Sequence, residues 1–329
     1  MRRILGCFWN RDERRLRALW RLFVFGLLIL AVGLAATLLV PVAPAGNYVM
    51  AVALSIVATL LFLGGLWLAG RFVDRRPLAG FGLELSRQWW LDLAFGLGLG
   101  ALLMAFVFVV ESLAGWVEIT REASGRSAVR LLAAVVTHLV ICLAVGFGEE
   151  AISRGYVLRN LAEGLNLRRF GPRAAVAFAW VGSSVMFGLY HGVNPGATPL
   201  STANLMLAGL FLGLPYVLTG SLAVPIGLHV TWNFFQGPVF GFSVSGLALR
   251  PSLLEVRQTG PELLTGGAFG PEGGLVGVVA TALGALVVLW WIQNGRGELR
   301  LLTALAEPPA TASTLAAEAE VRPESSSPA

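Results

Sequence analysis

Long apolar stretches constrain the fold of this chain more than any other feature of its sequence. A transmembrane helix needs about 20 consecutive apolar residues, and eight stretches approach that length. Within lipid every backbone N–H and C=O must be paired inside the spanning segment, so such a stretch forms a helix. We therefore expect an all-α, polytopic membrane protein, a bundle of about eight transmembrane helices. The predicted spans are approximately residues 20–40, 47–70, 91–114, 131–153, 174–191, 199–219, 222–241 and 274–293.

The overall composition agrees with this class of protein. Of the 329 residues 56% are hydrophobic and only 13% are charged, whereas soluble domains carry about 25% charged residues. Nothing in the composition indicates a separate soluble domain. The two cysteines, Cys7 and Cys142, lie in a basic and an apolar segment, so we expect neither a disulfide nor a cysteine-based metal site.

The arginines are distributed unevenly between the two ends of the predicted bundle. All 24 basic residues are arginines, and 19 of them fall on one side if the N-terminus is inside. Short loops rich in Lys and Arg stay in the cytoplasm, so we expect both termini to be cytoplasmic in a multi-pass protein of the plasma membrane. The pI near 10.0 then reflects topology, and we expect contact with membrane lipid and no nucleic-acid partner.

The chain divides into five parts on this basis. A basic cytoplasmic N-terminus (1–19) precedes the first three transmembrane helices (20–130). A core with unusual polar residues (131–241) precedes an external loop and the last helix (242–306). The final segment (307–329) lacks apolar periodicity and has the composition of a disordered tail. The glycines Gly96, Gly98 and Gly100 in the third span predict close packing against another helix.

Two adjacent acids, Glu149 and Glu150, end an apolar run that is long enough to be embedded in the membrane. A charged side chain at the bilayer centre costs at least about 2.5 kcal/mol, so the pair requires an explanation. Arg154 follows Glu150 by one helical turn, in the orientation that favours an ion pair. Glu149 lies about 100° around the helix and lacks that partner, which leaves it available as a proton acceptor. A solvated cluster at a helix end is the alternative.

Two further pairs of polar or aromatic residues lie one turn apart in later spans. Phe187 precedes His191, and His229 precedes Asn233. Structural hydrogen bonds between helices would explain each pair separately. Taken with Glu149, however, they supply an acid, two imidazoles and an amide, which suit water activation and stabilisation of an oxyanion. Asparagine can donate a hydrogen bond but cannot act as a base, so it fits the second role.

The three motifs, in this order on successive helices, resemble the signature of the CPBP intramembrane proteases. That family includes the type II CAAX prenyl endopeptidases and the bacterial Abi and bacteriocin-processing proteins. Its signature is Glu-Glu-x-x-x-Arg, then Phe-x-x-x-His, then His-x-x-x-Asn or Asp. Each motif is intact here, within roughly residues 131–240.

The resemblance implies a role for each motif residue and a class of substrate. Glu149 and His191 would activate a water molecule that attacks a scissile carbonyl, and His229 and Asn233 would hold the oxyanion. The supporting residues would be Glu150, Arg154 and Phe187. The expected function is that of an intramembrane endopeptidase acting on a membrane-associated polypeptide.

The sequence leaves the question of a metal open. Glu149, His191 and His229 could ligate zinc, since two histidines and one glutamate form a known catalytic set. The helical His-Glu-x-x-His arrangement is absent, and the same residues permit a metal-free glutamate mechanism, which we favour.

Two other functions are compatible with these residues. A non-proteolytic scaffold or a bacteriocin-immunity protein could keep the fold and motifs and act by binding. A secondary transporter could relay protons through Glu149 and His229, although the lack of an inverted repeat argues against it.

A simple arrangement of spans places His191 too far from Glu149. At 1.5 Å per residue, His191 would lie about 25 Å from the start of its helix near Ala174. We therefore expect the fourth span to continue to about Leu161 and the fifth to end inside the membrane. Residues 192–196 would then form irregular backbone lining a cavity.

Overall fold

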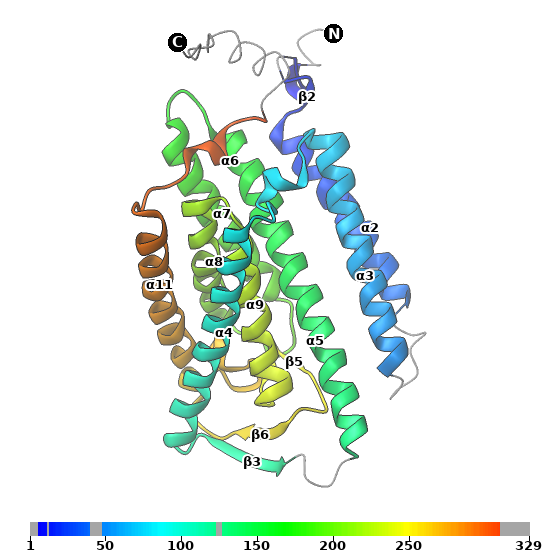
Figure 1. Ribbon diagram of the computed structural model, residues 1–329, viewed down its shortest axis with the longest axis vertical. Coiled ribbons are helices and arrows are strands. Elements are labelled where there is room, and N and C mark those ends of the chain that lie inside the picture. The colour runs from blue at the N-terminus through cyan, green and yellow to red at the C-terminus, as the bar shows by residue number, and fades with distance from the viewer. Residues whose placement is uncertain (1–5, 12, 40–47, 123–126, 310–329) are drawn as a thin grey trace, which may run out of the picture.

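A computed structural model describes residues 6–11, 13–39, 48–122 and 127–309 (Figure 1). Most of the predicted tail, residues 310–329, therefore lies outside the described residues. Within the described part, seven helical segments are long and apolar enough to cross a membrane. This confirms the expected all-α, polytopic membrane architecture. The helices are α2 (Ala18–Leu39), α3 (Tyr48–Leu68), α4 (Arg87–Leu113), α5 (Ala128–Glu150), which continues through a π-helical segment (Ala151–Leu158) into α6 (Arg159–Leu165), α7 (Gly171–His191), α8 (Pro199–Thr219) and α11 (Leu275–Arg296).

The short strands of the described chain form three antiparallel pairs. The longest pair is antiparallel and joins β3 (Val117–Glu122) to β6 (Leu254–Gln258). A tight hairpin, β4 (Ser243–Val244) and β5 (Leu247–Ala248), and a pair near the N-terminus, β1 (Trp9–Asn10) and β2 (Arg15–Leu16), are the other two. The connection between residues 242 and 273, expected as a loop, thus has ordered structure of its own.

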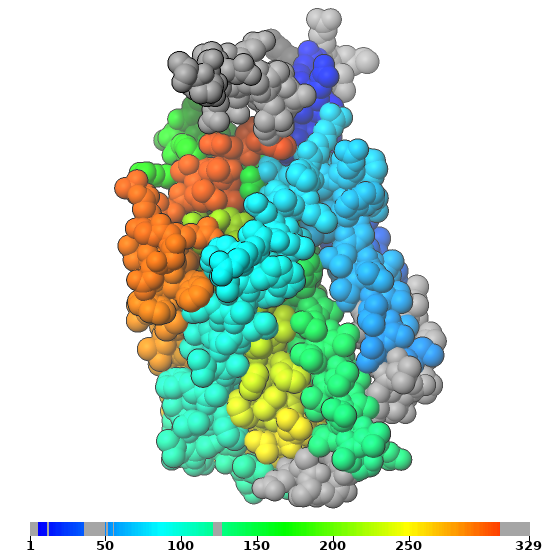
Figure 2. Space-filling model, viewed as in Figure 1, coloured from blue at the N-terminus to red at the C-terminus, as the bar shows by residue number. Residues whose placement is uncertain are grey.

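The predicted span at residues 222–241 is wrong in its extent. The structure has instead a helix of 12 residues, α9 (Ala223–Phe234), followed by a π-helical turn (Phe235–Val239). Nine of the 12 residues of α9 are buried, because the helix lies inside the bundle against α4, α5 and α8. Figure 2 shows the yellow chain at the end of α9 filling the space between α4 and α5. An apolar run that is buried by protein has the same composition as one that faces lipid.

Glycines allow α9 to approach α4 closely. A Cβ atom added at Gly96 would lie 2.5 Å from the Val224 carbonyl oxygen, and one at Gly227 would lie 2.4 Å from the Leu93 oxygen. By contrast, a Cβ added at Gly98 would meet nothing within 4 Å. The expected close packing is therefore confirmed for Gly96, and also for Gly100, but not for Gly98.

The fourth and fifth spans have the lengths that the site requires. One continuous helical segment of 38 residues runs from Ala128 to Leu165, as far as the predicted extension to Leu161 and beyond. α7 ends at His191, and residues 192–196 form turns and a bend before α8 begins at Pro199. The expected length of the fourth span and the irregular backbone after His191 are confirmed. The depth of His191 in the membrane stays a prediction.

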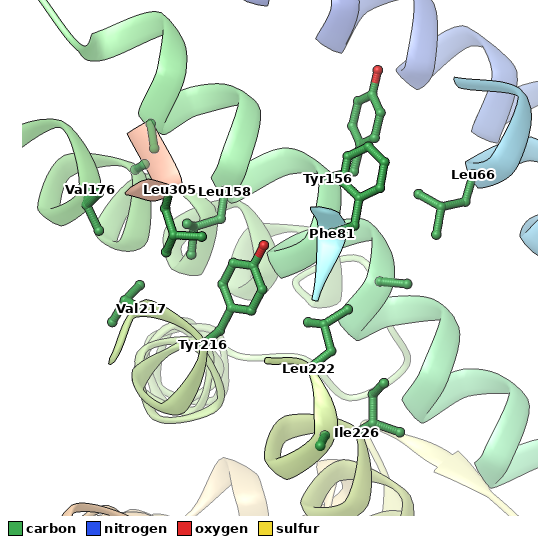
Figure 3. Close-up of a cluster of buried hydrophobic side chains, with 14 of the residues drawn as sticks. Leu66, Phe81, Tyr156, Leu158, Val176, Tyr216, Val217, Leu222, Ile226 and Leu305 are labelled. Atoms are coloured by element: carbon green, nitrogen blue, oxygen red, sulfur yellow. The ribbon is translucent and has the colours of Figure 1, made fainter. Parts of the chain in front are cut away.

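The apolar core surrounds the start of α9 and the π-helical segment Ala151–Leu158 (Figure 3). Tyr156 stacks between Phe25 and Phe81, with ring centroids 3.7 and 5.6 Å away. Leu222 and Tyr216 are fully buried in the same cluster. The core therefore joins the helices that carry the polar motifs to the N-terminal helices.

The two described ends of the chain lie at the same end of the bundle. Arg15 of β2 binds Glu163 of α6, and Arg159 of α6 donates to the Ala304 carbonyl oxygen. The seven long helices and the shorter α9 together run along the bundle an even number of times, as two ends at the same side require. The side of the membrane on which they lie stays a prediction.

The glycine contact leads to a prediction about stability. Gly96→Ala should destabilise the protein by roughly 1–3 kcal/mol, because the added methyl group meets rigid backbone of α9. Gly98→Ala is the matched control, in the same helix with open space around it, and should be neutral or stabilising. Thermal unfolding in detergent measures both. Equal melting temperatures for the two variants would contradict the close α4–α9 contact.

Candidate active site

The three polar motifs meet inside the bundle. Glu149 is on the last turn of α5, His191 on the last turn of α7 and His229 in the middle of α9. One carboxylate oxygen of Glu149, Oε2, lies 3.7 Å from Nε2 of His191 and 4.0 Å from Nε2 of His229. Segments separated by up to 80 residues in sequence thus place a carboxylate and two imidazoles around one point.

Glu150, directly and through Arg154, links four of the helices that form this site. Its Oε1 accepts hydrogen bonds from Arg154 Nη1 at 2.9 Å and from His229 Nδ1 at 2.8 Å. Arg154 also donates to the Gly209 carbonyl oxygen of α8 at 2.9 Å and lies 4.5 Å above the ring of Phe187. The expected Glu150–Arg154 ion pair is present and fully buried. Burial of charge requires such pairing and hydrogen bonding.

The contacts of the ring nitrogens indicate how each imidazole is oriented. Nδ1 of His191 lies 2.8 Å from the Phe187 carbonyl oxygen, which can only accept, so Nδ1 carries the hydrogen. Nδ1 of His229 likewise donates to Glu150. Nε2 of each ring is therefore the atom that faces Glu149. In a neutral ring this nitrogen is an acceptor, and in a charged ring it is a donor.

Glu149 and Glu150 differ in their access to solvent. The Glu149 side chain is 27% exposed, whereas that of Glu150 is fully buried. Among the described residues, the ionisable groups within 4 Å of Glu149 are the two imidazoles, whereas Glu150 contacts Arg154 and His229. Water can therefore reach the first carboxylate and not the second.

A cavity of about 50 Å³ adjoins the two imidazoles, and one water molecule needs about 10–15 Å³. Asn233 is on its wall, and no hydrogen bond is formed by the amide of Asn233 within the described part of the chain. The amide is therefore free to donate into the cavity. Most of the wall comes from α7, α8, α9 and α11, through Phe187, His191, Asn204, Leu205, Ala208, Phe211, Leu212, Leu228, His229, Trp232, Asn233, Val278 and Thr281.

Ser245 and Glu272, both in the 242–273 connection, complete this wall. Neither was predicted from the sequence. Glu272 accepts from the backbone N–H of Ser245, from its hydroxyl at 2.7 Å and from Trp232 Nε1 at 3.3 Å. No local pattern marks Glu272, because its partners are remote in sequence. Asn204 binds the Gly273 carbonyl oxygen at 2.8 Å, and as a lone amide in an apolar span it offered a signal.

The site contains residues that could in principle ligate a metal ion. Glu149, His191 and His229 have the ligand chemistry of a catalytic zinc set, and both histidines have their second ring nitrogen engaged, as metal ligands do. Among the described residues, however, no group of three or more His, Cys, Asp or Glu is placed so that it could hold a metal ion.

The contrast between the adjacent acids gives a prediction about stability. Glu150→Ala should destabilise the protein by roughly 3–5 kcal/mol, because it leaves the Arg154 guanidinium buried without a counter-charge. Glu149→Ala, at the next position, should change stability little, since Glu149 is partly exposed and has no arginine partner. Thermal unfolding of the two variants side by side measures the difference. A larger loss for Glu149→Ala would contradict the assignment of Glu150 as the structural acid.

Comparison with known proteins agrees with the motif pattern. Residues 131–235 match the family model of type II CAAX prenyl endopeptidases, described as Rce1-like. No curated protein and no solved structure matches the chain. The matched segment contains α7, α8, α9 and both acids, and so includes all three motifs. Over residues 131–235, less than half of its length, the chain is therefore similar to the CAAX protease family.

Proposed function

We propose that the protein is an intramembrane endopeptidase that hydrolyses a peptide bond in a membrane-associated polypeptide. The observation that carries this proposal is the position of Glu149, whose carboxylate faces Nε2 of His191 and of His229 within 4.0 Å. The family match supports a CAAX-type endopeptidase in general.

Glu149 and His191 act on the attacking water. A water molecule between them donates one hydrogen to Glu149 and one to Nε2 of His191, which directs its lone pair at the scissile carbonyl carbon. As the C–O bond forms, the first proton passes to Glu149. Glu149 then gives this proton to the amide nitrogen while the C–N bond breaks, so the carboxylate is regenerated.

His229 and Asn233 stabilise the negative charge that develops on the carbonyl oxygen. When His229 carries both ring hydrogens, Nδ1 donates to Glu150 and Nε2 can donate to the developing oxyanion. The amide of Asn233 supplies a second donor that needs no change of protonation. Donors that are held in place before the reaction stabilise a transition state most effectively in a site with little water.

The proposed role of Glu149 as the base leads to a prediction about the cleavage rate. Glu149→Gln should lower the cleavage rate by roughly 10²–10⁴-fold, because the amide cannot accept a proton. The substrate is found by comparing the membrane peptides of cells that express wild type or Glu149→Gln, and the rate is then measured with purified protein in liposomes. Asn233→Ala should cost about 10²–10³-fold.

The exposed Glu84→Gln is the control, since it changes charge equally and lies outside the site. Identical peptide sets for wild type and Glu149→Gln would contradict proteolysis. If a cellular effect of the protein also survived in Glu149→Gln, it would favour the non-proteolytic scaffold or immunity protein.

The proposed metal-free mechanism leads to a prediction about metal removal. Cleavage should be unchanged after treatment with EDTA and 1,10-phenanthroline, since we propose that Glu149 rather than a zinc ion activates the water. Elemental analysis of the active protein should find no stoichiometric zinc. Loss of activity with the chelators and its recovery on addition of zinc would overturn the metal-free mechanism.

A further inference from the structure

A second cavity lies at the end of the bundle where α3 turns toward α4. Its volume is about 440 Å³, and it shares no residue with the wall of the candidate active site. Its lining combines three arginines with apolar side chains, through Trp67, Arg71, Arg75, Arg76, Pro77 and Leu78. The proposed hydrolysis makes no use of this cavity.

The backbone brings the arginines to one place. α3 ends in a π-helical segment, Ala69–Asp74, and Arg75 then adopts a left-handed conformation with φ 55°. The chain reverses there, and the Arg76 N–H donates to the Gly70 carbonyl oxygen at 2.8 Å. As a result Arg71, Arg75 and Arg76 line the same cavity although the first is a full turn away in sequence.

The positive charge at this cavity is incompletely balanced. In the described chain neither Arg71 nor Arg75 forms an ion pair, and both are exposed. Arg76 is buried and pairs with Glu163, but its Nε has no hydrogen-bond partner. Burial lowers the pKa of Arg76 to about 10 despite the attraction of Glu163, so this arginine remains charged at neutral pH.

Glu163 cannot neutralise the arginines alone. Its carboxylate is shared with Arg15 at 2.7 Å and Arg21 at 2.9 Å in addition to Arg76. Asp74, the other buried acid nearby, pairs with Arg21 at 3.0 Å. Arg15 also pairs with Glu13, and Arg159 lies 4.0 Å from Glu163. Six arginines are therefore grouped with three carboxylates, and the cavity presents an excess of guanidinium groups suited to the oxygens of a phosphate.

The lining of the cavity includes an exposed tryptophan, Trp67. Trp67 is 49% exposed and meets the exposed ring of Phe72 edge-on at 6.1 Å. Trp90, near the start of α4, is also exposed. Tryptophan is enriched where hydrocarbon meets headgroups, and basic pockets at this depth suit lipid phosphates. A ligand there would have an anionic head and an apolar body.

We propose that this cavity binds the phosphate of an anionic phospholipid headgroup, with Arg71 and Arg75 as the principal contacts. A soluble phosphate ester has the same anionic group but would make no use of the exposed apolar rim around Trp67. The lipid is therefore the occupant that the surface favours. The proposal is independent of the hydrolytic activity.

Native mass spectrometry of the full-length protein tests this proposal. Detergent-purified protein is exposed to phosphatidylglycerol or to the zwitterionic phosphatidylcholine, and retained lipid is counted. Wild type should retain phosphatidylglycerol preferentially. The double variant Arg71→Gln/Arg75→Gln should bind it about tenfold or more weakly, because each arginine near a lipid surface contributes measurably to anion binding.

The control variant is Arg168→Gln/Arg169→Gln, which removes the same charge from exposed positions at the α6–α7 connection and should bind like wild type. Equal loss in both double variants would show a general charge effect and overturn the proposal. Equal retention of the two lipids by wild type would do the same. Displacement of the lipid by millimolar inorganic phosphate or glycerol 3-phosphate, at no cost to stability, would instead assign the cavity to a soluble ligand.

Discussion

The buried carboxylate of Glu150 is the interaction on which the rest of the site depends. It holds the guanidinium of Arg154 and the imidazole of His229, and Arg154 in turn binds the backbone of α8 and covers Phe187 of α7. Four helical segments are thus tied to one buried acid. Removing charge from water is costly, and this cost is offset only if all of these partners are in place. The network therefore fixes the side of His229 that faces Glu149.

The fold makes one of two adjacent carboxylates accessible to solvent and buries the other. Glu149 points toward solvent-accessible space and two imidazoles, while Glu150 points into protein. This division requires a short central helix, because α9 must carry His229 into the bundle rather than along its surface. Glycines on α4 and α9 make that position available by letting the backbones touch. The close packing of α9 on α4 therefore helps to place His229 beside Glu149.

Much of this arrangement could be predicted from the sequence, for identifiable reasons. Helical periodicity alone pairs Glu150 with Arg154, and the requirement that Glu149 reach His191 predicts the long helix through Leu161 and the turn after His191. The extent of α9 could not be predicted, because apolar residues buried by protein and by lipid look alike. Contacts such as Glu272 with Ser245 depend on how a long connection folds back, and no local pattern encodes them.

The contact between Glu149 and both imidazoles can be measured without a substrate. The chain has only three histidines, His138, His191 and His229, so ¹⁵N-histidine labelling gives a spectrum simple enough to assign by single substitutions. Solid-state NMR in lipid should show that Glu149→Gln shifts the Nε2 resonances of His191 and His229. His138, about three turns away on α5, should not move. If neither the His191 nor the His229 signal responds, the carboxylate is not their neighbour and the account of the site fails.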